Sequence, residues 1–189
     1  MKRICAVMIG LAVLIATPGV ANADATHQQA INLVIQRALS QRGVPYAYGG
    51  GNVAGPSLGT ASVDTAVGAA DPSLGATPLP GSVGATGLSL APEPQVTRVG
   101  FDSSGLVVYA FAGVGIKMPR SSGEQYKVGQ KVLPSQALPG DLIFYGPEGT
   151  QSVALFIGNG QIIEATDPAV TVSPVRTNGM TPYLTRIIG

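Results

Sequence analysis

The stretch of residues 49–98 constrains this chain more than any other feature, because it contains no aromatic residue and few charged ones. It is rich in Gly, Ala, Ser, Pro and Thr, so it cannot bury enough apolar surface to offset the entropy that is lost when a chain is ordered. The hydrophobic core must therefore come from the residues on either side. We predict a long mobile loop at about 51–98 within one domain, or alternatively a linker that follows a separate N-terminal helix.

The first residues have the pattern of a secretory signal peptide, residues 1–23. Lys2 and Arg3 are basic, residues 4–16 are mostly apolar, and residues 21–23 (Ala-Asn-Ala) have the small-x-small form of a cleavage site. We expect cleavage after Ala23, or alternatively after Ala25, and a secreted, cell-wall-associated protein. The apolar run is short for a membrane-spanning helix, so we expect no stable membrane anchor.

Cleavage would remove Cys5, the only cysteine of the chain. The mature chain would then have no disulfide, no thiolate nucleophile and no cysteine ligand for a metal. Cleavage would also remove two of the 11 basic residues and none of the 10 acidic ones, which leaves a net charge close to zero. This balance gives no electrostatic basis for binding nucleic acid. We predict neither a metal site nor a cofactor.

Outside the Gly-rich stretch, helical patterns come first and strand patterns follow. Residues 26–42 have apolar side chains at helical spacing, and Thr26 with Gln29 fits a capping box. Asp102 and Ser103 can cap a second helix that ends at Gly113. A short helix is expected within 119–126, and strands are expected at 141–145, 153–157, 161–165, 170–172 and 183–188. This order indicates an α+β fold in which N-terminal helices pack on an antiparallel sheet.

Four motifs of the chain carry a resemblance to one enzyme family. They are GVPYAYGG at 43–50, FDSSGLV at 101–107, PGDLIFY at 139–145 and QSVALFIGNG at 151–160. In this order they resemble the motifs of the NlpC-type cell-wall peptidases, which are papain-like hydrolases of peptidoglycan. The resemblance covers the chain from about residue 30 to the C-terminus, apart from the Gly-rich stretch. It implies one papain-like domain at 24–189, with the stretch as an enlarged loop inside it.

The resemblance also implies which positions correspond to the catalytic residues of the family. The nucleophilic cysteine corresponds to Ser103, the histidine to Ser152 and the third polar residue to Glu164. A hydroxyl is a weak nucleophile unless a base removes its proton, and Ser152 is not a base at neutral pH. His27 is the only histidine and lies far from these motifs. We therefore predict a pseudoenzyme, similar to the mycobacterial Rip group and to a member of that group that binds peptidoglycan without hydrolysing it.

A groove that keeps its shape without these catalytic groups is predicted to hold peptidoglycan stem peptides. For each of these residues a structural role is the alternative. It is helix capping for Asp102 and Ser103, an ordinary strand position for Ser152 and Glu164, and core packing for Tyr46 and Tyr48, the early tyrosines of the motif at 43–50. Cell-wall hydrolases or other envelope proteins are further candidate partners. The candidate ligand-binding residues are Tyr46, Tyr48, Asp102, Ser103, Ser104, Tyr126, Ser152 and Glu164.

Two other functions are consistent with the sequence. The first is weak peptidoglycan endopeptidase activity that uses Ser103 with an unidentified base, for which Lys117, Lys127 and Lys131 are conceivable. The second is a cell-wall interaction module whose Gly/Ala/Pro-rich stretch docks a protein partner. Release of peptides from purified sacculi distinguishes the first from a binding function, and deletion of the stretch tests the second.

Overall fold

The protein is represented by a computed structural model that describes residues 19–62 and 95–189. Within these ranges the helices are α1 (Gly19–Leu39), α2 (Ser103–Ala112) and α3 (Ser122–Lys127), with short 3-10 helices at Pro134–Gln136 and Pro147–Gly149. The strands are β1 (Ser57–Ser62), β2 (Gln95–Gly100), β3 (Gln130–Val132), β4 (Leu142–Tyr145), β5 (Ser152–Gly158), β6 (Gln161–Ala165), β7 (Val170–Pro174) and β8 (Leu184–Arg186). The predicted α+β class is confirmed.

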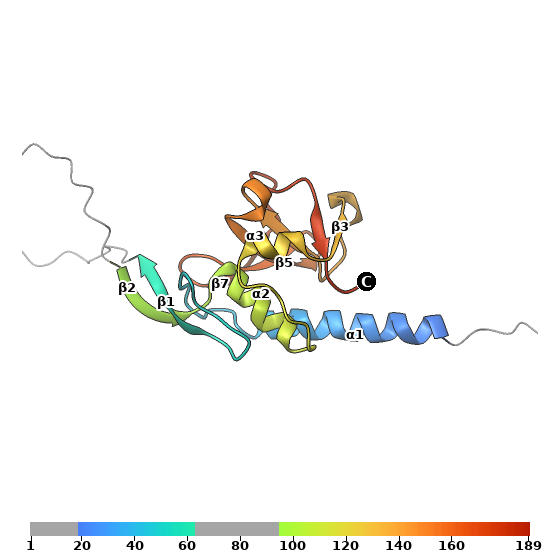
Figure 1. The fold of residues 1–189 in the computed structure, drawn as a ribbon, viewed down its shortest axis with the longest axis horizontal. Helices are drawn as coiled ribbons and strands as arrows, with labels where there is room; N and C mark the ends of the chain where they lie inside the picture. Colours follow the sequence, from blue (N-terminus) through green and yellow to red (C-terminus); the bar gives the residue numbers. More distant parts are fainter. Residues whose placement is uncertain (1–18, 63–94) are drawn as a thin grey trace, which may run out of the picture.

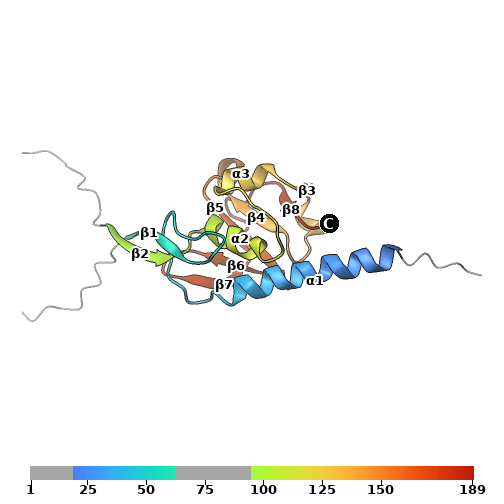
Figure 2. The same ribbon diagram turned by 60° about the horizontal axis from the view of Figure 1, so that its bottom comes forward.

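Six strands form one antiparallel sheet in the order β3-β8-β4-β5-β6-β7 (all six are labelled in Figure 2). The predicted hairpin is formed by β5 and β6, and Asn159 in its turn adopts a left-handed backbone with a φ of 53°. Five of the strands lie close to their predicted ranges. β3 was not predicted, because its residues (Gln-Lys-Val) do not alternate between apolar and polar side chains.

The two faces of the sheet carry separate apolar clusters, because successive strand residues point to opposite faces. α2 lies between α1 and the sheet and covers the first face (Figures 1 and 2). The first cluster includes Val34, Ala38, Leu106, Val107, Phe111, Leu142, Phe144, Val153, Leu155 and Ile163. The second consists of Val132, Ile143, Tyr145, Ala154, Ile162 and Leu184. α2 is apolar nearly all round since both of its sides are buried.

The first helix begins earlier than the sequence predicted. α1 starts at Gly19, so Thr26 lies inside the helix and the capping box at Thr26 and Gln29 is wrong. Residues 20–25 contain no proline and no glycine, so the helix continues through them despite the local capping signal. Its N-terminal turns extend beyond the rest of the fold, as both views show (Figures 1 and 2). Of the predicted signal peptide, only residues 19–23 are described.

The stretch predicted as a loop contains two strands. β1 and β2 pair in antiparallel fashion along their whole length, and Tyr48 pairs with Thr60 at the other edge of β1. Glycine serves close packing here: a Cβ atom at Gly100 would lie 2.1 Å from the carbonyl oxygen of Pro45. The loop prediction is therefore wrong at both ends of the stretch. Its middle, residues 63–94, lies outside the described residues.

Across residues 19–62 and 95–189, no helix combines the length and the apolar character that a membrane span needs.

Candidate functional site

Asp102 and Ser103 lie at the N-terminus of α2. Asp102 is the N-cap, with an extended backbone, and its Oδ1 accepts a hydrogen bond of 2.6 Å from the N–H of Gly105. Ser103 is the first residue of the helix. Its hydroxyl therefore lies beside unpaired backbone N–H groups at the positive end of the helix dipole. This is a position that favours a negatively charged or hydrogen-bond-accepting group.

The carboxylate of Asp102 links three segments of the chain. Besides the cap, it accepts hydrogen bonds from the Ser104 hydroxyl at 3.1 Å and the Gly49 N–H at 3.0 Å. Arg120 donates to both of its oxygens, at 2.9 and 2.8 Å. The same guanidinium donates to the hydroxyl of Ser104 and to the carbonyl oxygen of Gly50. The polar groups of Asp102 and Ser104 are thus committed to contacts within the protein.

A hollow of about 400 Å³ opens at this helix end. It brings together the segment that carries the early tyrosines, the N-terminus of α2, the turn before α3 and the residues just before β5. Five predicted site residues line it: Tyr46, Tyr48, Asp102, Ser103 and Ser104. Arg120 and Gln151 line it as well. Because these segments are far apart in sequence, the fold itself creates the site.

The two early tyrosines occupy this hollow differently. Tyr48 is 71% exposed, which excludes core packing as its role. Tyr46 is partly buried against the main apolar cluster and also lines the hollow. Burial raises the pKa of the Tyr46 phenol, and the nearby charge of Asp102 raises it further. Tyr46 is therefore a neutral hydrogen-bond donor at physiological pH.

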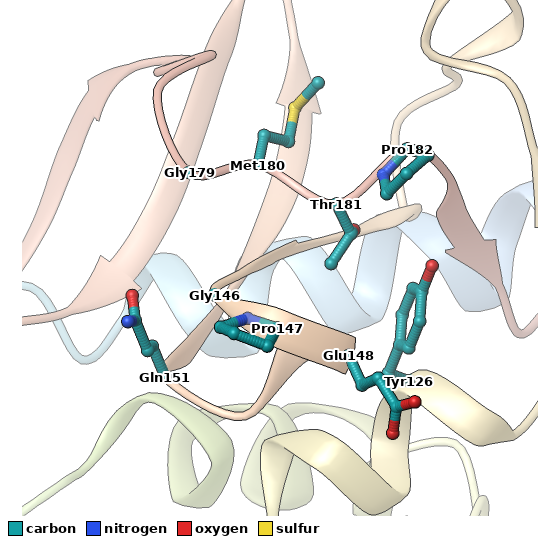
Figure 3. Close-up of a pocket in the computed structure, with 9 residues that line it drawn as sticks. All are labelled: Tyr126, Gly146, Pro147, Glu148, Gln151, Gly179, Met180, Thr181 and Pro182. Atoms are coloured by element: carbon teal, nitrogen blue, oxygen red, sulfur yellow. The ribbon is translucent and has the colours of Figure 1, made fainter.

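Ser152 and Tyr126 do not line this hollow. Ser152 begins β5 directly after Gln151 and pairs with Tyr145 of β4. Gln151 also lines a second hollow of about 470 Å³, whose wall includes Tyr126 (Figure 3). The two hollows therefore adjoin at Gln151. The Tyr126 ring packs edge-on against Phe144, with 5.2 Å between the ring centroids.

Glu164 is buried in β6 instead of being the solvated strand residue that was its alternative reading. Its side chain is 4% exposed and forms a two-pronged ion pair with Arg176, with 2.7 Å between Oε2 and Nη2. The Ser173 hydroxyl donates to Oε1 at 2.6 Å. Burial opposes ionisation of Glu164, but the hydrogen bonds from Arg176 and Ser173 outweigh it and lower the pKa of the carboxyl. Glu164 does not line the first hollow.

Three residues of this region were missed by the sequence reasoning. Gln151 could have been found from the sequence, because it directly precedes Ser152 in the motif at 151–160. Arg120 and Arg176 had none, because each contacts a carboxylate that is distant in sequence: Asp102 and Glu164, respectively. Arg176 also lies over the ring of Tyr145, with 4.5 Å between its guanidinium carbon and the ring centroid.

Asp102→Asn is expected to lower the free energy of unfolding by about 1 kcal/mol. The amide oxygen can still cap α2, but the charged pair with Arg120 is lost, and exposure of that guanidinium limits the loss. Urea unfolding followed by circular dichroism measures the change. Asp167→Asn, at an exposed carboxylate outside this network, is the control and should change stability by less than about 0.5 kcal/mol. Equal losses in the two variants would contradict the structural role given to Asp102.

Comparisons with known proteins identify the family. The NlpC/P60 family profile matches residues 82–189. The peptidoglycan endopeptidase RipB of Mycobacterium tuberculosis is 49% identical over 166 residues, which are 87% of this chain and 56% of RipB. The chain thus spans about half the length of that curated relative.

Two solved structures of single domains match the fold over most of the chain. The P60 domain of an antigen from M. avium paratuberculosis has a TM-score of 0.66 and 49% identity, covering 87% of this chain and 97% of that domain. RipD from M. tuberculosis, described as a non-catalytic NlpC/p60 domain protein adapted to peptidoglycan binding, has a TM-score of 0.63 and 52% identity, covering 85% of this chain and 98% of RipD. The predicted likeness to the Rip group, RipD included, is confirmed, and the chain belongs to the NlpC/P60 family.

Proposed function

We propose that this protein binds peptidoglycan stem peptides at the hollow beside α2 and does not hydrolyse them. One observation carries the proposal: Ser103 is the first residue of α2 and lines the hollow. The motif resemblance assigns Ser103 to the family's nucleophile position and Ser152 to the position of its base. The description of RipD as a non-catalytic peptidoglycan-binding protein supports it, since RipD is 52% identical.

The groups around Ser103 are suited to hydrogen bonding and poorly suited to proton transfer. Among the described residues that line the hollow, Asp102 is the sole carboxylate, and its oxygens already accept five hydrogen bonds. A carboxylate so engaged is a poor base toward a hydroxyl. The neutral phenol of Tyr46, the exposed Tyr48 ring and the helix N–H groups can instead hold a peptide.

Weak hydrolysis through Ser103 is the second candidate function, and it requires a base that the hollow would have to supply. The three lysines considered from the sequence, Lys117, Lys127 and Lys131, are absent from the described residues that line it. Lys127 and Lys131 line a small cavity beside Tyr126. These positions favour binding over hydrolysis.

The test is co-sedimentation of residues 24–189, the predicted mature chain, with purified peptidoglycan sacculi. We expect the protein in the pellet, and no released muropeptide in the supernatant by mass spectrometry. Protein that remains soluble would refute binding, and released peptides would establish the endopeptidase instead. The predicted signal peptide and secretion to the cell wall are part of this proposal, and reporter export by residues 1–25 tests them.

Tyr48→Ala is expected to weaken sacculus binding about three- to tenfold, because it removes an exposed ring from the hollow. The affinity is measured by the same sedimentation assay at several sacculus concentrations. Tyr183→Ala is the matched control, since Tyr183 is 45% exposed and does not line the hollow. If both variants bind equally well, the ligand lies elsewhere.

A third candidate function, a docking module for an envelope protein, is favoured by the hairpin. Leu58 of β1 and Val99 of β2 pair directly, and both are exposed. A deletion of 55–94 would remove β1, so the informative deletion is 63–94, which leaves both strands. Loss of partner recruitment with retained sacculus binding would assign that segment to the partner.

A further inference from the structure

The second hollow has mainly apolar walls and a single carboxylate. Figure 3 shows Tyr126, Pro147 and Pro182 around it, with Met180 at its upper edge and the Glu148 side chain beside Tyr126. Among the described residues that line it there is no lysine, arginine or aspartate. The hollow can therefore take up an aliphatic chain, and Glu148 is its one source of charge.

Glu148 is an exposed residue of a tight turn, and its carboxylate has no partner among the described residues. Its backbone is left-handed, with φ 50° and ψ 28°, which is unusual for a residue with a side chain. The turn around it is fixed by hydrogen bonds from Gly149 to Gly146 and from Thr150 to Pro147. Within the described part of the chain, Glu148 forms no hydrogen bond and no ion pair.

The nearby lysines are placed so that they leave the hollow itself without a cation. Lys131 lies over the Tyr126 ring, 3.2 Å from its centroid, and donates to the Tyr126 carbonyl and to the Thr185 hydroxyl. Lys127 and Lys131 line a separate cavity, at whose boundary Tyr126 and Glu148 stand. Glu148 thus lines both cavities, and in the larger hollow it is the one charged residue among the described lining residues.

The contact between the two hollows indicates which ligand can place a charged group in the second one. Gln151 lines both, so a peptide over Ser103 can extend one side chain into the second hollow without leaving the surface. An aliphatic side chain fits the apolar walls, and an ammonium group at its end matches the carboxylate. The peptide and its side chain would thus be bound at two adjoining places.

We propose that the second hollow is a subsite for an aliphatic side chain that ends in a free amine, and that Glu148 reads its charge. This inference rests on the proposed binding of stem peptides and specifies which peptides bind best. Acylation of the amine, as in a cross-link, removes the positive charge and leaves Glu148 unpaired. The protein therefore distinguishes stem peptides with a free side-chain amine from those whose amine is acylated.

The test uses two synthetic peptides, L-Ala-γ-D-Glu-L-Lys-D-Ala and the same peptide acetylated at the lysine Nε. Isothermal titration calorimetry at low salt measures their dissociation constants for the purified protein. We expect the free-amine peptide to bind about two- to fivefold more tightly, the range for a charge pair at an exposed site. The preference should shrink as sodium chloride is added, because salt screens such a pair.

Glu148→Gln should weaken only the free-amine peptide and so abolish the preference. Glu124→Gln is the matched control: Glu124 is an exposed residue of α3 outside the hollow, and glutamine preserves its capping contact with Ser121. Equal binding of both peptides by the unsubstituted protein, or a preference that persists in Glu148→Gln, overturns the inference and leaves peptide binding intact. Binding of neither peptide overturns the inference and the proposed function together.

Discussion

The double variant Ser103→Cys/Ser152→His is expected to release peptides from sacculi at least about a hundredfold faster than the unsubstituted protein. The first change places a thiol at the first residue of α2, where the helix dipole and adjacent N–H groups favour the thiolate. The second places an imidazole at the start of β5, beside Gln151 of the same hollow. Muropeptide release followed by mass spectrometry measures the rate.

The two substitutions must act together, because a nucleophile and its base form one catalytic unit. Either single variant should therefore stay near the background of the unsubstituted protein. Ser103→Ala/Ser152→His is the matched control, since it carries the imidazole without a nucleophile. A folded double variant that releases no peptide would show that the groove has diverged beyond these two positions, and would contradict the assignment of Ser103 and Ser152.

The motif resemblance assigns the third position of this unit to Glu164, and part of the hydrogen-bonding capacity of its carboxylate is already used. Glu164 follows Ile163, which pairs with Leu155, so it lies on the sheet face that Ser152 shares. Arg176 and Ser173 use three acceptor sites of its carboxylate. A carboxylate has about four acceptor sites, so one site remains for an introduced imidazole. This shared carboxylate limits the expected activity to well below that of a dedicated catalytic unit.

The sheet and α2 could be predicted because their signals are local. The alternation in residues 161–165 and the Asn159-Gly160 turn specify the β5–β6 hairpin without reference to the rest of the chain. Asp102 specifies the start of α2 for the same reason. The tyrosine and serine motifs located most of the first hollow, because the family resemblance joins segments that no local pattern could join.

The β1–β2 hairpin and the arginine contacts could not be predicted from composition. Gly59 belongs to the stretch whose Gly-rich composition indicated a mobile loop, yet Gly59 and Gly100 allow β1, β2 and the segment before Gly50 to pack backbone against backbone. The partners of Arg120 and Arg176 depend on tertiary contacts between distant segments. The burial of Glu164 could not be predicted either, because nothing in its neighbourhood in the sequence shows that Arg176 covers it.

Arg176→Met is expected to lower the free energy of unfolding at pH 7 by about 2 to 3 kcal/mol. The variant leaves Glu164 buried without its ion-pair partner, and removal of one member of a buried pair costs about 3 to 5 kcal/mol. The loss expected for Arg176→Met is smaller than that general range because the guanidinium is 46% exposed and its charge is therefore partly screened by water. Urea unfolding of both proteins measures the difference.

The difference should depend on pH in a definite direction. The pKa of Glu164 is lowered in the folded protein, so its ionised form stabilises the fold above the ordinary glutamate pKa of about 4.3. This contribution is lost as the pH falls through the lowered folded-state pKa. Without Arg176, burial raises the pKa of Glu164 in the folded variant. The gap between the unsubstituted protein and Arg176→Met should therefore be large at pH 7 and shrink as the pH falls from the raised pKa of the variant through the lowered pKa of the unsubstituted protein. A gap that stays constant with pH would mean that packing on Tyr145 and not charge explains it.

The double variant Glu164→Gln/Arg176→Met separates these two causes. Removal of both charges leaves no buried unpaired carboxylate, so the double variant should be more stable at pH 7 than Arg176→Met alone. Recovery of most of the lost stability would show that Arg176 chiefly neutralises Glu164. The ion pair would then serve chiefly to keep the buried Glu164 carboxylate ionised between β6 and the segment that follows β7.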